Sequence, residues 1–200
     1  MEWYEDEVRA IERAHALNPP PPGATVFYGS SSLRLWSTLE EDLAPWPVVN
    51  RAFGGSTLAA CNYFFERLVP PCAPGSLVLY AGDNDLGDGQ PASSVIGSLH
   101  RLLDKIDKIC GDIPVAFMAI KPSPARWRLR YAIRQVNDAA RQALTARPKG
   151  YFIDVYQPML QRNGEPVATL FADDGLHLSA EGYRLWAAIL RTFQFPLFDP

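Results

Sequence analysis

The serines of Gly29-Ser-Ser-Ser32 are candidate nucleophiles because they follow a glycine at the end of an apolar run. A serine hydroxyl is a weak nucleophile until a base takes its proton, and a histidine serves best when a carboxylate fixes its tautomer. His15 and His100 fall within predicted helices, whereas His177 lies in a polar turn three residues after Asp174. Asp174 and His177 are therefore the candidate base and orienting carboxylate, although a solvated acidic turn with an incidental histidine would show the same spacing.

Two further residues have the chemistry to stabilise a negative oxygen. An oxyanion needs preorganised N–H donors, which Gly55 supplies from its backbone and Asn84 from its side-chain amide. Each residue also has an ordinary structural explanation, as a tight turn or an Asx-type loop residue. Asp83-Asn-Asp85 does not continue as a calcium-binding loop, because Gly87 and Ser94 stand where that loop needs an oxygen ligand and a glutamate. The sequence shows no metal-ligand set, phosphate loop or dinucleotide fingerprint, so we expect no metal and no cofactor.

Alternating strands and helices must position these residues. Apolar runs predict strands at 25–28, 48–52, 77–80, 115–118 and 151–154, and helical spacing predicts helices at about 2–17, 58–68, 91–109, 127–146 and from Ser179 onward. This alternation predicts a three-layer α/β/α sandwich with a central, mainly parallel five-stranded sheet. In such sheets ligands bind beyond the carboxyl ends of the strands, where the serine, Gly55 and Asn84 segments would converge.

Composition bounds the remaining possibilities. The 200 residues, 48% of them hydrophobic, fit one domain covering 1–200. A net charge of −3 with scattered basic residues argues against nucleic acid as a partner. The acidic first residues do not resemble a secretory signal, no apolar run approaches the length of a membrane span, and the three cysteines lack paired or metal-ligand spacing. We therefore expect a cytoplasmic location; the pattern does not indicate an oligomeric state.

Four blocks together resemble those of the SGNH hydrolases, also called GDSL-like lipases and acylhydrolases. They are Gly29-Ser-Ser31, Asn50-Arg-Ala-Phe-Gly-Gly55, Gly82-Asp-Asn-Asp85 and Asp174-Gly-Leu-His177, in the family's order. The resemblance implies that Ser31 is the nucleophile, that Asp174 and His177 complete the triad, and that Ser31, Gly55 and Asn84 form the oxyanion hole. It also implies a flavodoxin-like sheet and hydrolysis of carboxylic esters or thioesters through an acyl-enzyme, without a metal.

The sequence departs from the family pattern at two positions. Ser30 replaces the aspartate of Gly-Asp-Ser, and Ala52 replaces a glycine that is often found in the second block. The first change leaves Ser30 and Ser32 as alternative nucleophiles. An α/β-hydrolase is a poorer match, because its nucleophile elbow Gly-x-Ser-x-Gly would require glycine where Leu33 stands. A catalytically inactive module that binds a sugar or acyl ligand in the same pocket is the alternative function.

The expected substrate is a small-molecule ester with a short acyl group. The predicted elements follow one another closely and leave no inserted segment for the lid that a long-chain lipase usually carries. Four residues on or near the loops after the strands are candidates to shape the pocket: Trp36, Phe53, Arg126 and Trp127.

Overall fold

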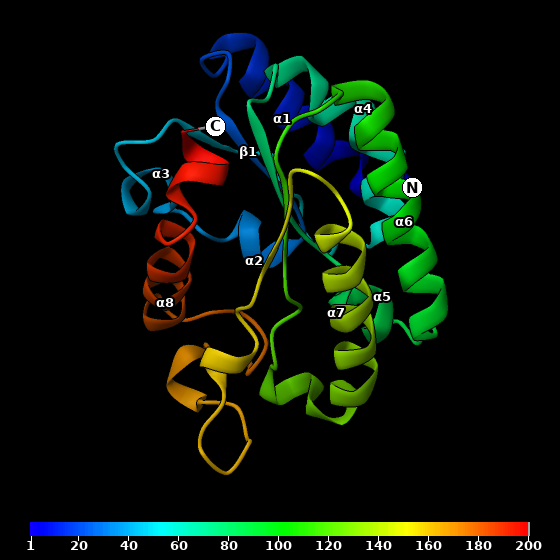
Figure 1. Cartoon of the computed structure of the whole chain (residues 1–200), viewed down its shortest axis with the longest axis vertical. Helices are drawn as coiled ribbons and strands as arrows, with labels where there is room; N and C mark the ends of the chain where they lie inside the picture. The colour runs from blue at the N-terminus through cyan, green and yellow to red at the C-terminus, as the bar shows by residue number, and fades with distance from the viewer. Residues whose placement is uncertain (200) are drawn as a thin grey trace.

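The computed structural model describes residues 1–199, which form one parallel sheet with helices on both faces (Figure 1). The strands are β1 (Thr25–Gly29), β2 (Val48–Asn50), β3 (Ser76–Tyr80), β4 (Val115–Met118) and β5 (Gly150–Ile153), in the spatial order β2-β1-β3-β4-β5. All four strand pairs are parallel. The prediction of a three-layer α/β/α sandwich with a five-stranded parallel sheet is confirmed.

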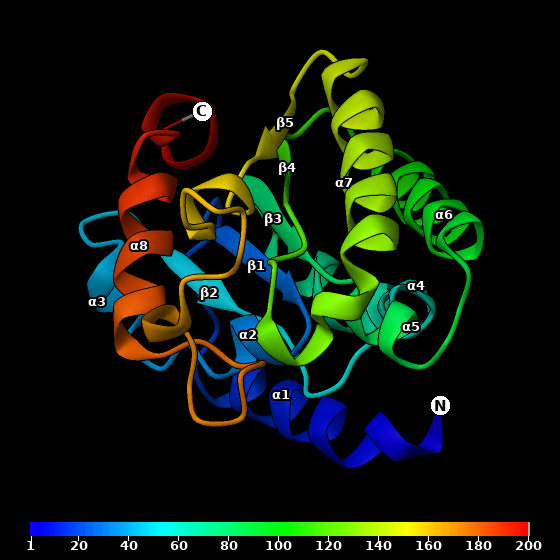
Figure 2. The ribbon, with the colours of Figure 1, turned by 90° about the horizontal axis from the view of Figure 1, so that it is seen from below.

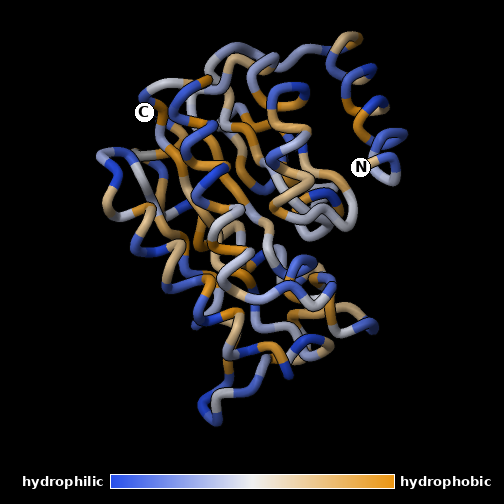
Figure 3. The backbone as a smooth tube through the Cα atoms, turned by 90° about the vertical axis from the view of Figure 1, so that its right-hand side faces the viewer, coloured by the Kyte–Doolittle hydropathy of each residue, from blue (hydrophilic) through white to orange (hydrophobic). Residues whose placement is uncertain are grey.

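The strands form because their sequences are continuous apolar runs that are buried on both faces. β1, β3 and β4 are buried throughout, as expected for central strands covered by helices. Figure 3 shows hydrophobic residues concentrated in the middle of the chain trace and hydrophilic ones toward its rim. The half-buried β5 forms an edge of the sheet.

Eight α-helices surround this sheet within the described residues. They are α1 (Glu5–Leu17), α2 (Ser31–Arg34), α3 (Leu39–Asp42), α4 (Leu58–Leu68), α5 (Asp83–Gly87), α6 (Ala92–Cys110), α7 (Arg130–Thr145) and α8 (Ala180–Arg191). Helices α4, α6 and α7 lie on one side of the sheet and α3 and α8 on the other (Figure 2). None of the helices within residues 1–199 is both long enough and apolar enough to cross a membrane.

Local sequence explains where the longer helices begin. The Ser179 hydroxyl accepts a hydrogen bond from the N–H of Gly182 at 3.2 Å, which confirms the predicted N-cap of α8. Thr57 caps α4 in the same way, with its side chain accepting from the N–H of Ala60 at 3.1 Å. The N-terminal helix predicted at 2–17 consists of a 3-10 turn, Glu2–Tyr4, followed by α1.

The structure contains three short helices, α2, α3 and α5, in segments where the sequence predicted neither a helix nor a strand. The predicted loop at Gly82-Asp-Asn-Asp85 is wrong from Asp83 onward, where the chain forms the short helix α5. The helix predicted from residue 127 begins at Arg130 and is preceded by a 3-10 helix, Pro124–Leu129. A proline in the first turn, where its missing N–H is not needed, is compatible with that start.

Candidate active site

Three predicted site residues from distant parts of the chain meet at the carboxyl end of the sheet. The Nε2 atom of His177 lies 3.1 Å from the Ser31 hydroxyl oxygen, and its Nδ1 atom lies 2.6 Å from Oδ2 of Asp174. Ser31 begins α2 directly after β1, whereas Asp174 and His177 belong to the turn before α8. The order Ser31, His177, Asp174 along these contacts is the arrangement of a catalytic triad.

Close packing between β1 and β3 sets the position of Ser31. Gly29 has φ of +146°, and a Cβ atom at this residue would overlap the carbonyl of Tyr80 on the neighbouring strand. The N–H of Ser30 donates to the same carbonyl at 2.9 Å. A glycine is therefore required where the chain leaves β1, and the turn it permits places Ser31 at the first position of α2.

The turn before α8 is organised by the carboxylate of Asp174. Its Oδ1 atom accepts hydrogen bonds from the backbone N–H groups of Leu176 at 2.8 Å and His177 at 2.9 Å. The hydrogen bond from the His177 side chain, together with these two N–H groups, lowers the pKa of Asp174 to about 2. Gly175 supplies the left-handed backbone at φ of +62° that the turn needs. Asp174 is thus ionised and fixed against the imidazole.

The predicted oxyanion donors lie near Ser31. Gly55 adopts a left-handed φ of +66°, and within the described chain no oxygen accepts its backbone N–H or that of Ser31. The Nδ2 atom of Asn84 donates one hydrogen bond to the Ser56 carbonyl at 3.1 Å, which leaves its second N–H available. Ser31, Gly55 and Asn84 also line the same surface hollow as His177.

A model of the GDSL-like Lipase/Acylhydrolase family matches residues 21–185 of this sequence. The chain belongs to this family. The rat and mouse platelet-activating factor acetylhydrolase IB subunits alpha1 are each 26% identical over 163 residues, covering 79% of this chain and 69% of the relative. Together the family and these relatives support a general esterase or acylhydrolase role.

Solved structures agree with the family assignment at the level of the fold. A protein from Streptococcus pneumonia superposes with a TM-score of 0.82 at 20% identity, covering 96% of this chain and 94% of that one. A GDSL-like lipase from Bacteroides thetaiotaomicron has a TM-score of 0.75 at 21% identity, over 92% and 95% of the two chains. The family 3 carbohydrate esterase of Clostridium thermocellum has a TM-score of 0.69 at 17% identity, over 86% and 96%. These likenesses show the SGNH hydrolase fold.

The other two serines of Gly29-Ser-Ser-Ser32 point elsewhere. Ser30 is fully buried, and Ser32 is 1% exposed. The hydroxyl of Ser32 accepts a hydrogen bond from Nζ of Lys121 at 2.9 Å, in the interior behind Ser31. Neither residue lines the hollow that contains His177. Of the three serines, the geometry therefore favours Ser31 as the nucleophile.

The hollow around Ser31 has a volume of about 460 Å³ and walls that the sequence did not indicate. Besides the residues above, it is lined by Trp3, Glu7, Arg34, Gly54 and Leu176. The Glu7 carboxylate accepts the N–H of Gly54 at 2.8 Å and lies 3.3 Å from Nε of Arg34. Trp3 and Glu7 precede the residues matched by the family model, whereas Arg34, Gly54 and Leu176 lie within them.

The four residues predicted to shape the pocket do not line this hollow. Trp36 is 2% exposed and stacks on Tyr183 of α8, and Phe53 is fully buried in the core. Arg126 instead donates from Nη2 to Oδ1 of Asn84 at 3.0 Å, behind the hollow. The prediction failed because aromatic residues beside a loop fit a core equally well, and spacing alone does not show which way they point.

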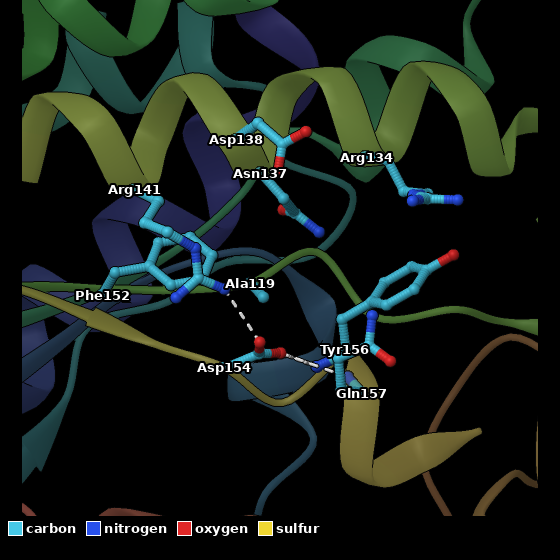
Figure 4. A pocket seen from close by; sticks show the side chains of 9 residues that line it. All are labelled: Ala119, Arg134, Asn137, Asp138, Arg141, Phe152, Asp154, Tyr156 and Gln157. Atoms are coloured by element: carbon cyan, nitrogen blue, oxygen red, sulfur yellow. Dashed lines mark hydrogen bonds and ion pairs between the residues drawn. The ribbon is translucent and has the colours of Figure 1, made fainter.

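A second hollow lies between α7 and the chain after β5 and is shown in Figure 4. Arg141 spans it, placed over the ring of Phe152 and donating to Oδ2 of Asp154 at 2.8 Å. Its lining contains no serine, cysteine or histidine. It therefore offers no nucleophile–base pair like that of Ser31 and His177.

Proposed function

We propose that the chain is a serine esterase that cleaves carboxylic esters through an acyl-enzyme on Ser31. The observation that carries this proposal is the pair of contacts made by His177, 3.1 Å from the Ser31 hydroxyl and 2.6 Å from the Asp174 carboxylate. Nε2 of a neutral imidazole can accept the hydroxyl proton only if Nδ1 carries the ring proton. The ionised Asp174 beside Nδ1 favours that tautomer. Thioesters fit the same chemistry.

In the acylation step, Ser31 Oγ attacks the ester carbonyl carbon while its proton passes to Nε2 of His177. Collapse of the tetrahedral intermediate breaks the bond to the alcohol oxygen, which leaves with that proton. Water then attacks the acyl-enzyme and gives a proton to His177, and Ser31 recovers it as the carboxylic acid departs. Asp174 stays ionised throughout and stabilises the imidazolium that forms in each half.

The negative oxygen of each intermediate meets three donors in this proposal. They are the backbone N–H groups of Ser31 and Gly55 and the second side-chain N–H of Asn84. Donors fixed in place before the reaction need no reorganisation when the charge develops, which is why such groups lower the barrier.

We further propose that short acyl groups, acetyl to butyryl, are favoured. Of the nine residues that line the hollow, only Trp3 and Leu176 have apolar side chains. A further methylene contributes about 0.8 kcal/mol only when apolar surface covers it. The name of the rat and mouse relatives, acetylhydrolase, supports the same preference. The values of kcat/KM for p-nitrophenyl esters from acetyl to palmitoyl test it, and a steady rise toward palmitoyl would contradict it.

The deciding experiment combines turnover with covalent labelling. Wild type should hydrolyse p-nitrophenyl acetate and gain the mass of one fluorophosphonate adduct, whereas Ser31→Ala should do neither while keeping its circular dichroism spectrum. Ser94→Ala, an exposed serine on α6, is the matched control and should behave as wild type. Activity that survives Ser31→Ala but is lost in Ser30→Ala or Ser32→Ala would move the nucleophile. A wild type that neither turns over nor labels would favour an inactive sugar- or acyl-binding module.

A further inference from the structure

We propose that Arg126 is a positioning residue that orients the Asn84 amide toward the oxyanion, as part of a segment, Lys121–Arg126, that aligns the whole site. The inference rests on the proposed esterase function. This segment follows β4 and contains none of the four family blocks. In Figure 2 it runs close to α2 and α5, the two short helices that carry Ser31 and Asn84.

The contacts of Asn84 determine which way its amide faces. Nη2 of Arg126 donates to Oδ1 of Asn84 at 3.0 Å, and Nδ2 of Asn84 donates to the Ser56 carbonyl at 3.1 Å. The Arg126 guanidinium has only donors, so a flipped Asn84 amide, which would place Nδ2 against it, could not form this hydrogen bond. In the observed orientation the remaining Nδ2 hydrogen is left for the oxyanion. A turned amide would present an oxygen there instead, and two negative oxygens repel.

Buried charges hold Arg126 in place. Its Nη1 atom lies 3.2 Å from Oδ2 of Asp83, and Nζ of Lys121 lies 3.2 Å from the same oxygen. The Lys121 side chain is 1% exposed, that of Asp83 6% and that of Arg126 18%. Burial acts to raise the pKa of Asp83, but the two cations hold it below its ordinary value. The carboxylate is therefore charged, and it anchors the guanidinium beside Asn84.

The same segment also contacts the nucleophile helix and the turn before α8. Lys121 donates to the Ser32 hydroxyl at 2.9 Å and to the Tyr80 hydroxyl at 3.1 Å, so it joins the first turn of α2 to β3. The backbone N–H of Ala125 donates to the carbonyl of Gly175 at 3.0 Å, between Asp174 and His177. One stretch of six residues thus touches the elements that carry nucleophile, oxyanion donor and base.

The test is a double-mutant cycle between Arg126 and Asn84. Arg126→Met keeps much of the side chain's length but removes every donor, and Arg126→Lys keeps one donor group and the charge beside Asp83. Arg128→Met, an exposed arginine in the same 3-10 helix with no ion pair or side-chain hydrogen bond among residues 1–199, is the matched control. Each change is made in wild type and in Asn84→Ala, and kcat and KM for p-nitrophenyl acetate are measured with the thermal midpoint.

We expect Arg126→Met to lower kcat about 10- to 100-fold, somewhat less than loss of an oxyanion donor, with KM nearly unchanged. Arg126→Lys should recover part of this loss, and Arg128→Met should have no effect. In the Asn84→Ala background Arg126→Met should change kcat little, because the amide it orients is gone.

Equal losses in both backgrounds would overturn the inference, since they would indicate a general structural role. So would an unchanged kcat in Arg126→Met. These outcomes require a wild type whose turnover depends on Ser31, and a wild type without turnover would instead overturn the proposed function and this inference with it.

Discussion

The two sides of the site differ in how the chain holds their charged groups. On the interior side, Lys121 and Asp83 are 1% and 6% exposed and neutralise each other behind Asn84. On the surface side, the side chains of His177 and Asp174 are 30% and 50% exposed, and the Asp174 carboxylate accepts its hydrogen bonds from residues of its own turn. Burying charge is costly unless it is paired, whereas an exposed turn exchanges its contacts with water at little cost.

This difference separates chemical from structural effects of substitution. In the proposed mechanism, a change on the surface side removes a group that takes part in proton transfer and leaves the core untouched. A change on the interior side leaves a buried charge with fewer partners inside the protein. We therefore expect the surface side to affect mainly the rate, and the interior ion pair to affect mainly the stability.

The largest expected effect comes from His177→Ala. Removing the base should lower kcat by about 10⁴-fold or more, because Ser31 then has no group to accept its proton. The thermal midpoint should stay close to that of wild type, since the side chain is 30% exposed. Stopped-flow or end-point assays with p-nitrophenyl acetate, beside thermal unfolding, measure both. Full activity in this variant would remove His177 from the mechanism.

Next in size is the loss of stability when the interior pair is broken. Lys121→Met leaves Asp83 with Arg126 as its one ion-pair partner among residues 1–199. Loss of all pairing would cost about 3 to 5 kcal/mol, so we expect the free energy of unfolding to fall by less than this but by more than for an exposed pair. Arg141→Met breaks an exposed ion pair with Asp154 (Figure 4) and should cost less than about 1 kcal/mol. Urea unfolding of the two variants decides the comparison. Similar losses in both would show that burial does not distinguish the two pairs.

Asn84 belongs to both sides of the comparison. Its side chain is buried, with the residue 9% exposed, but in the proposed mechanism it donates to the oxyanion of the substrate. Loss of one oxyanion donor in Asn84→Ala should lower kcat about 10²- to 10³-fold and leave KM nearly unchanged. Steady-state kinetics with p-nitrophenyl acetate separates the two parameters. A raised KM at constant kcat would instead place Asn84 in ground-state binding.

The smallest expected effect is the pH dependence of the surface side. The pKa of Asp174, lowered to about 2 chiefly by its hydrogen bond from His177, keeps this carboxylate ionised at every working pH. The pH dependence of the rate therefore reports the base, which must be neutral to accept a proton. We expect kcat/KM to rise roughly tenfold per pH unit at the acid end and then level off. A flat profile would contradict a histidine base.

The sheet and the contact between Asp174 and His177 could be predicted because their signals are local. A continuous apolar run such as Val115–Met118 fits a central strand of a parallel sheet, which is buried on both faces. Asp174 meets His177 within a single turn. The contacts of Lys121 with Ser32 and of Arg126 with Asn84 join residues 89 and 42 positions apart. Hydrophobic periodicity along the sequence does not predict contacts between residues so far apart. The sequence offered one signal, a lysine three residues after the apolar run 115–118, near the carboxyl ends of the strands where ligands bind.

The pocket wall made by the N-terminal residues was missed for a different reason. Trp3 falls within the helix predicted at about 2–17, but its side chain is 87% exposed. Trp3 sits in the short 3-10 turn before α1. The helical spacing therefore predicted α1 but not the separate 3-10 turn that precedes it.

The exposure of Trp3 gives the protein an optical reporter of its own. An indole in water emits at longer wavelength than one in an apolar setting, and Trp36 and Trp186, at 2% and 0% exposure, already lie in the core. A molecule that settles in the hollow beside Ser31 displaces water from Trp3, so emission should shift toward shorter wavelength. In Ser31→Ala this shift would follow the binding of colourless, uncleaved esters, and Trp3→Phe would abolish it. Natural substrates could thus be ranked by fluorescence titration without a chromogenic leaving group.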